Sequence, residues 1–178
     1  ICTALGDVSR AALELNLIGC ITSSMLIKRS ILDQVYPLDE SLPGCHDTDL
    51  KIQLSQLCHF DYVDEVLVFK SGGNRGISTS PAKDAGREML IAKYEHLYKR
   101  RAAGVRRLAL ARHFCSSGRR AIKQQRDWAT GLHALLRSFL LNPSVVAEML
   151  RRGTSRRLNR RRRRLGSGTD ADHVAQSE

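Results

Sequence analysis

Residues 38–57 read LDESLPGCHDTDLKIQLSQL, and this stretch changes character near its centre. Residues 38–44 are rich in Pro, Gly, Ser and acidic residues, which is the composition of a loop. From Asp47 onward, leucines recur at helical spacing with polar residues between them. The stretch therefore predicts a loop that leads into a helix, with the carboxylates of Asp47 and Asp49 near the positive end of the helix dipole.

Two short apolar segments on either side of this stretch predict β-strands. Residues 19–27 (GCITSSMLI) are short, apolar and partly β-branched, which favours a buried strand. Residues 66–69 (VLVF) predict a second strand, and a glycine-rich turn follows it at residues 71–76. A brief helix between the first strand and the loop should end before Pro37. Residues 1–80 are therefore predicted to form a mixed α/β unit.

After Pro81 the apolar residues follow a helical period, so residues 81–152 are predicted to form an all-helical appendage. The strongest amphipathic pattern is Trp128, Leu132, Leu135, Leu136 and Phe139, which we expect to be the core of a helix pair. Residues 153–178 contain few apolar side chains. Because they cannot offset the entropy of ordering, they are predicted to form a disordered, Arg-rich tail.

The net charge of +11 is distributed unevenly along the 178 residues. Up to Tyr98 there are 9 Lys and Arg against 13 Asp and Glu, whereas from Lys99 onward there are 20 against 5. Residues 151–165 alone carry nine arginines and no acidic residue. This run has three readings: a solvated tail without a partner, a contact with an anionic membrane surface, or binding to nucleic acid. No aromatic residue interleaves the run, which disfavours sequence-specific nucleic-acid binding.

The five cysteines are an odd number and include no Cys-x-x-Cys pair, so isolated thiols in a reducing cytoplasm are expected, with no protein-bound metal. The first residues show neither the charged nor the apolar region of a signal peptide. No apolar run reaches the roughly 18–20 residues that a membrane span requires. These features predict a cytoplasmic protein, with a peripheral membrane location left open.

The order of residues between positions 14 and 80 resembles the second half of family 2 glycosyltransferases, which have the GT-A fold. The resemblance rests on an ordered set of residues: Val35, Asp39, Glu40, Leu42, Asp47, Asp49, Leu50, Leu54, Phe60, Glu65, Val66, Leu67, Val68, Ile77 and Ser78. This chain has Tyr36, Leu38, His46, Thr48 and Gln53 where that family has Gly, Phe, Glu, Trp and Arg.

The resemblance implies the acceptor-side half of a GT-A nucleotide-diphospho-sugar transferase and an inverting sugar transfer from a nucleotide-sugar to an acceptor hydroxyl. Asp47 stands where that family places its general base, and Asp49 is expected to be mainly structural. His46 would hydrogen-bond the acceptor, and Gly19 would let substrate approach closely. Asn74 and Arg75 would close over the substrate.

The resemblance also implies partners and a cofactor that these residues do not hold. The complete enzyme would use Mg or Mn, with ligands in a nucleotide-binding half that lies upstream of Ile1. The 178 residues alone would then be inactive. The acceptor would be a glycan or a lipid-linked molecule.

Two other functions stay open at this point. A basic helical adaptor or nucleic-acid-binding protein without catalysis would account for the second half of the chain. An inactive remnant of a glycosyltransferase would account for the departures in the motif. An adaptor would not need the acidic, Asp-rich first half, and this difference favours the enzyme.

Overall fold

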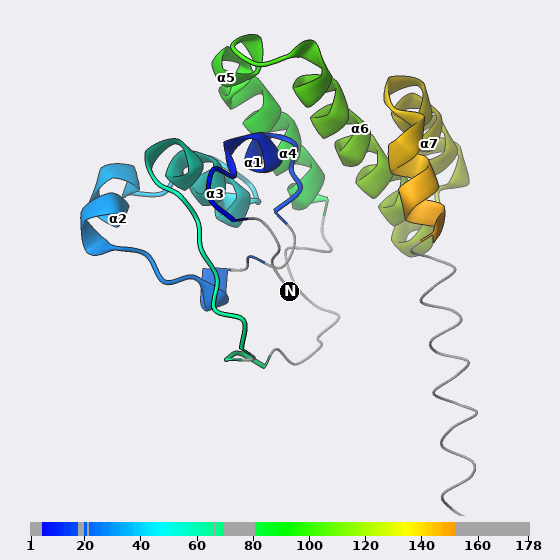
Figure 1. Ribbon diagram of the computed structural model, residues 1–178. Helices are drawn as coiled ribbons and strands as arrows, with labels where there is room; N and C mark the ends of the chain where they lie inside the picture. Colours follow the sequence, from blue (N-terminus) through cyan, green and yellow to red (C-terminus); the bar gives the residue numbers. More distant parts are fainter. Residues whose placement is uncertain (1–4, 18–19, 21, 66, 70–80, 152–178) are drawn as a thin grey trace, which may run out of the picture.

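The computed structural model describes residues 5–17, 20, 22–65, 67–69 and 81–151, and within these residues the chain is helical (Figure 1). In chain order the helices are α1 (Ser9–Leu13), α2 (Arg29–Val35), α3 (His46–Leu57), α4 (Ala82–Lys93), α5 (Glu95–Lys99), α6 (Ala103–Arg120) and α7 (Trp128–Leu141). A 3₁₀ turn, η1 (Thr22–Ser24), precedes α2, and a π-helical turn, η3 (Ala121–Gln125), follows α6. Residues 143–151 are also helical.

Local sequence signals account for several of these boundaries. The helix predicted before Pro37 is confirmed as α2, which ends at Val35 because the residue before proline avoids helical geometry. The helix predicted from Asp47 is confirmed as α3, which has Asp47 and Asp49 in its first turn. Asp127 caps α7, since its carboxylate accepts a hydrogen bond from the backbone N–H of Thr130 at 3.0 Å.

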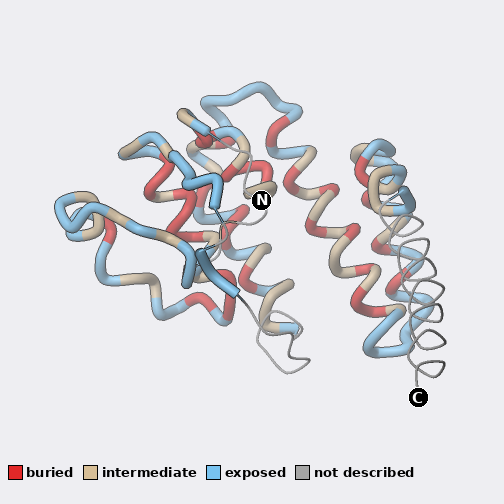
Figure 2. Tube along the Cα trace, turned by 60° about the horizontal axis from the view of Figure 1, so that its bottom comes forward, coloured by how far each residue is buried: buried red, intermediate tan, exposed pale blue. Residues whose placement is uncertain are grey.

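The main core lies where α1 and α3 meet α4, α5 and α6 (Figure 1). Its buried residues come from both sides of position 80: Ala12, Leu13, Leu42, Cys45, Ile52, Leu90, Ile91, Tyr94, Tyr98, Val105 and Ala109. A smaller cluster joins α2 to α3 through Val35, Leu50 and Leu54. Figure 2 shows buried positions recurring along the helices, as amphipathic packing requires.

A third cluster joins α6, α7 and the helical residues 143–151. Ala111, Cys115 and Val145 are buried there, and Leu108, Leu135, Leu141 and Met149 pack against them. Helix α7 lies at the outer edge of the molecule, against α6 (Figure 1). These three helical segments end the described part of the chain at residue 151.

The predicted α/β fold is wrong for the described residues, which contain no β-strand or sheet. Their β pairing is limited to an isolated antiparallel bridge, in which Gly6 and Phe60 exchange two backbone hydrogen bonds of 2.8 and 2.9 Å. Within the predicted first strand, Thr22–Ser24 form the 3₁₀ turn and Leu26 is fully exposed. Within the second, Phe69 is 90% exposed. A short apolar segment becomes a strand only beside another strand, and no described segment provides one.

The predicted burial of the amphipathic stripe on α7 is also wrong. Trp128, Leu132, Leu136 and Phe139 are each more than half exposed, and only Leu135 packs against the core. The helical spacing was interpreted correctly, but the buried face of α7 is made by smaller residues. Helical period alone therefore did not identify the face that packs.

Candidate functional site

The loop that precedes α3 is held tightly against α4. A Cβ atom added to Gly86 would lie 2.3 Å from the backbone oxygen of Gly44, so the loop and the helix are in backbone contact. The thiol of Cys45 donates a hydrogen bond to the backbone oxygen of Lys83 at 3.4 Å. Cys45 itself has a φ of 70°, a left-handed conformation that is uncommon for a residue other than glycine. This constrained residue comes directly before His46 and Asp47.

Asp47 lies in the first turn of α3 with a carboxylate that solvent reaches. Its side chain is 48% exposed, and the ammonium group of Lys51 donates to Oδ2 at 3.2 Å. The Lys51 side chain is itself buried, and the hydroxyl of Thr48 donates to Oδ1 of Asp47 at 3.5 Å. His46 is partly exposed beside it. The two residues predicted to meet the acceptor are thus neighbours at the start of one helix.

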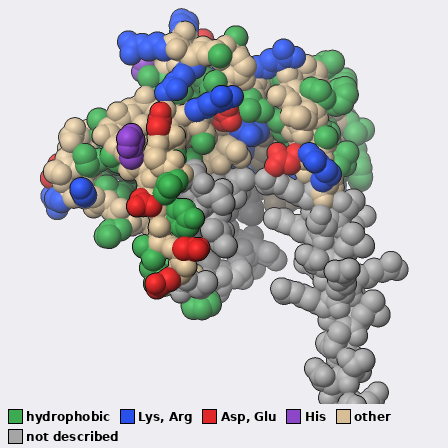
Figure 3. All heavy atoms as spheres, viewed as in Figure 1, with side chains coloured by type: hydrophobic (Ala, Val, Ile, Leu, Met, Phe, Trp, Pro, Cys, Tyr) green, Lys and Arg blue, Asp and Glu red, His purple; other side chains and the backbone are tan. Residues whose placement is uncertain are grey.

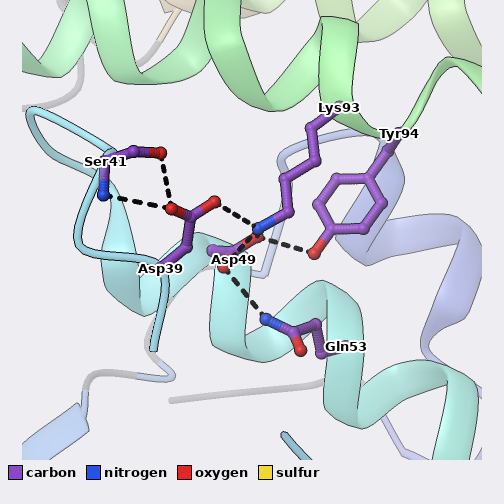
Figure 4. Close-up of polar contacts among 6 residues, drawn as sticks. All are labelled: Asp39, Ser41, Asp49, Gln53, Lys93 and Tyr94. Atoms are coloured by element: carbon purple, nitrogen blue, oxygen red, sulfur yellow. Dashed lines mark hydrogen bonds and ion pairs between the residues drawn. The ribbon is translucent and has the colours of Figure 1, made fainter. Parts of the chain in front are cut away.

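Asp49, two residues further along, is buried and fully engaged (Figure 4). The hydroxyl of Tyr94 donates to Oδ1 at 2.6 Å, and the amide nitrogen of Gln53 donates to Oδ2 at 2.9 Å. The ammonium group of Lys93 lies 3.1 Å from the same carboxylate. Burial and the hydrogen bond to Asp49 raise the pKa of Tyr94, so the tyrosine stays a neutral donor. Asp49 therefore joins α3 to α4, as its predicted structural role requires.

Lys93 extends this network to the loop (Figure 4). It donates to Oδ2 of Asp39 at 2.8 Å, and the backbone N–H and hydroxyl of Ser41 donate to Oδ1 of Asp39 at 3.1 and 2.5 Å. The hydrogen bonds from Lys93 and Ser41 lower the pKa of Asp39 to about 2. For Lys93, burial acts in the opposite direction, but the bonds to Asp39 and Asp49 outweigh it and raise its pKa. The loop before Asp47 is thereby fixed at a second point.

Cationic side chains from α4 lie in the electrostatic neighbourhood of Asp47. Burial lowers the pKa of Lys83 and of Arg87, and Arg87 lowers that of Lys83 further, while Asp47 acts on both weakly in the opposite direction. Burial also raises the pKa of Cys45, so its thiol stays protonated and is not a nucleophile.

The contact between α4 and α6 contains buried polar atoms without a hydrogen-bond partner: Oδ1 of Asp84, Nη1 of Arg87 and Nδ1 of His113. The other oxygen of Asp84 pairs with Arg120, and Nε2 of His113 lies 3.2 Å from Glu88. Burial lowers the pKa of His113, which keeps the ring neutral. Buried polar atoms of this kind usually contact a water molecule or an ion.

The described residues do not fit a divalent cation. They contain no group of three His, Cys, Asp or Glu side chains that could hold a metal ion. Asp47 and Asp49 spell Asp-x-Asp, but both oxygens of Asp49 already accept hydrogen bonds from Tyr94, Gln53 and Lys93. No step of the chemistry is therefore assigned to a metal held by these residues.

The remaining predicted site residues, Gly19, Asn74 and Arg75, lie outside the described residues and stay predictions. The sequence also did not suggest that Lys93 and Asp39 would meet. Lys93 lies 54 residues after Asp39, and its neighbour Tyr94 stands at helical spacing from apolar residues in the sequence. The hydroxyl of that tyrosine was the available signal, because a buried Tyr usually finds a polar partner.

Comparisons of the chain with protein-family profiles, with curated proteins and with solved structures gave no match. The resemblance to family 2 glycosyltransferases therefore rests on the ordered residues of this sequence alone.

Proposed function

We propose that this chain supplies the acceptor side of an inverting glycosyltransferase, with Asp47 as the general base. The observation that carries the proposal is the difference in burial between two neighbouring carboxylates, Asp47 and Asp49. Asp49 is buried and accepts hydrogen bonds from Tyr94 and Gln53, whereas Asp47 is half exposed and accepts longer hydrogen bonds from Lys51 and Thr48. A base must be accessible to the hydroxyl whose proton it removes, and the exposure of Asp47 supports this role.

The reaction is a single displacement at the anomeric carbon of the sugar. The acceptor hydroxyl oxygen attacks that carbon and forms the new C–O bond, while the bond from the carbon to the diphosphate oxygen breaks. The departing nucleoside diphosphate takes the electron pair of the broken bond. Asp47 takes the acceptor proton, and attack from the face opposite the leaving group inverts the configuration.

The surroundings of Asp47 suit this chemistry in two ways. The loop before it is held by the contact with Gly86 and by Lys93, so the carboxylate sits on a fixed element, which orients it without further reorganisation. The cationic side chains Lys83 and Arg87 would favour anionic groups on either reactant. The proposal depends on these residues and not on a β-sheet, which the described residues lack.

The test replaces Asp47 by Asn in the protein as its gene encodes it. Release of nucleoside diphosphate is measured with a panel of nucleotide-sugars and hydroxyl acceptors, and the configuration of the product is read by NMR. Loss of a general base typically costs about 10²–10⁴-fold in rate, so turnover should fall by that factor. Circular dichroism and thermal melting should remain those of the wild type.

The matched control is Asp33→Asn, which makes the same change in another exposed carboxylate with an i,i+4 partner, here Arg29 on α2. Its turnover should equal that of the wild type. Full activity in Asp47→Asn would reject Asp47 as the base. A wild-type protein that turns over no donor in the panel would reject sugar transfer itself.

A further inference from the structure

The outward face of α7 is a continuous apolar surface. Trp128, Leu132, Leu136, Phe139 and Leu140 are 61%, 58%, 56%, 52% and 67% exposed. In Figure 3, hydrophobic side chains gather at the right-hand edge of the molecule, over α7. Positions 128, 132, 136 and 139 follow the helical period, so these side chains lie on one side of the helix. Large apolar patches of this kind mark interaction surfaces.

The opposite face of α7 explains why the large residues point outward. Gly131, Ala134 and Ser138 are buried against α6, and the Ser138 hydroxyl donates to the backbone oxygen of Ala111 at 2.8 Å. A Cβ atom added to Gly118 would lie 2.7 Å from the backbone oxygen of Gly131, so the two helices are in backbone contact. Turning α7 to bury its large side chains would break this contact.

Basic groups lie beside the apolar face and follow it in the sequence. Arg137, which is exposed, places its guanidinium 4.0 Å from the ring centroid of Phe114. Arg107 donates to the backbone oxygens of Leu140 and Leu141 at the carboxyl end of α7. Residues 99–151, which include α6 and α7, carry 12 Lys and Arg against 2 Asp and Glu.

The last residues of the sequence contain few apolar side chains. Residues 152–178 contain only Leu158, Leu165, Val174 and two alanines as apolar residues. The combination of an apolar helix face with a concentrated positive charge is complementary to a lipid surface that carries negative charge.

We propose that α7 binds flat on an anionic lipid bilayer, with its Trp128-to-Leu140 face at the boundary between headgroups and acyl chains and the exposed Arg137 at the headgroups. No helix among the described residues is long and apolar enough to cross a bilayer. The 14 residues of α7 span about 21 Å along the surface. This inference is independent of sugar transfer, because it depends on a different face of the molecule.

Trp128 reports directly on this binding, since it is the only tryptophan of the sequence. The full chain is titrated with phosphatidylcholine vesicles that contain or lack phosphatidylglycerol, and tryptophan emission and co-sedimentation are measured. Anionic vesicles should shift the emission to shorter wavelength and sediment the protein, and 0.5 M salt should weaken both effects. Pure phosphatidylcholine should bind much less.

The decisive variant is Leu132→Ser with Leu136→Ser, which should lower the partition coefficient for anionic vesicles about tenfold or more. The matched control is Leu26→Ser with Leu67→Ser, two exposed leucines outside α7 that should leave binding unchanged. Both variants change side chains that the fold leaves in solvent, so each should keep the wild-type circular dichroism spectrum.

Several results would overturn the proposal. These are unchanged binding in the α7 variant, an equal loss in the control, or equal binding to vesicles without anionic lipid. An emission shift without vesicles that grows with protein concentration would assign the face to a second copy of this chain. A shift caused by a nucleic-acid duplex alone would assign it to nucleic acid. These measurements need no sugar donor, so their failure leaves the assignment of Asp47 untouched.

Discussion

The contact between α3 and α4 and the contact between α6 and α7 join helices by opposite means. In the first, Tyr94 and Lys93 donate across the interface to the buried carboxylate of Asp49. In the second, Gly118 and Gly131 have no side chain, and the helices meet backbone to backbone. The contact of α3 with α4 depends on hydrogen bonds between polar side chains. The contact of α6 with α7 depends on glycines that have no Cβ atom.

This difference has a functional consequence. The polar contact places Asp47 on a fixed helix start, because the same network holds the loop that precedes it. The close contact of α6 with α7 leaves the large apolar side chains of α7 outside. One contact therefore fixes the helix start that carries Asp47, and the other leaves an apolar helix face exposed.

The largest effect is expected from Asp49→Ala, which breaks the polar contact. The substitution leaves the Tyr94 hydroxyl and the Gln53 amide without their acceptor, and Lys93 keeps only Asp39. Each buried donor left without an acceptor costs about 1–3 kcal/mol. Urea denaturation should show a loss of this size, and a loss below about 1 kcal/mol would mean that the network does not stabilise the fold.

A smaller loss is expected from Gly118→Ala, which breaks the close contact. Alanine favours a helix over glycine by about 1 kcal/mol, but the new Cβ would lie 2.7 Å from the backbone oxygen of Gly131. We expect the clash to prevail and the free energy of unfolding to fall by about 1–3 kcal/mol.

Gly104→Ala is the control on the same helix, since a Cβ there meets nothing within 4 Å. It should leave stability unchanged or raise it by up to about 1 kcal/mol. If both alanines stabilise the protein, the close approach of α6 and α7 is disproved.

A smaller, pH-dependent effect on stability is expected from the ion pair between Asp39 and Lys93, which belongs to the contact of α3 with α4. The pKa of Asp39 is lowered in the folded protein from 3.8 to about 2. Its contribution is therefore complete above pH 4 and is lost as the pH falls towards 2, because the unfolded chain takes up the proton first. Wild-type stability should fall more steeply over this range than that of Asp39→Asn, as measured by urea denaturation at each pH. Parallel pH curves for the two proteins would contradict the ion pair.

The smallest effect on folding is expected from Leu136→Ser on the outward face of α7. This side chain is 56% exposed, so the free energy of unfolding should change by less than about 0.5 kcal/mol. Thermal melting in the absence of lipid measures it. A loss above about 1.5 kcal/mol would mean that the face is covered within the fold, and the membrane inference would then fail as well.

Helices were the part of the fold that local patterns predicted well. The start of α3 near Asp47, the end of α2 before Pro37 and the helical character after Pro81 all follow from local rules on dipoles, proline and periodicity. The two strands were predicted wrongly, because a short apolar run becomes a strand only through a partner distant in the sequence. The pattern of Leu26 and Phe69 carries no information about that partner.

For the candidate site too, the local features were predictable from the sequence and the long-range contacts were not. The sequence alone placed Asp47 and Asp49 together at a helix start and assigned them different roles, because their order with the surrounding residues resembles a known motif. It could not indicate that Lys93 would reach Asp49 from 44 residues away, or that Asp39 would share this ammonium group. Such contacts depend on how α4 packs and have no local signature.

The sequence by itself determined which segments are helical, where Asp47 stands and where the positive charge is concentrated, since these features depend on neighbouring residues. Only the tertiary structure decided that Asp49 is buried and Asp47 half exposed, and that α7 packs through Gly131, Ala134 and Ser138. The physical reason is that burial is a property of pairs of surfaces. A helical stripe of large apolar residues indicates a preference for leaving water, but the shape of the neighbouring helix decides which face it covers.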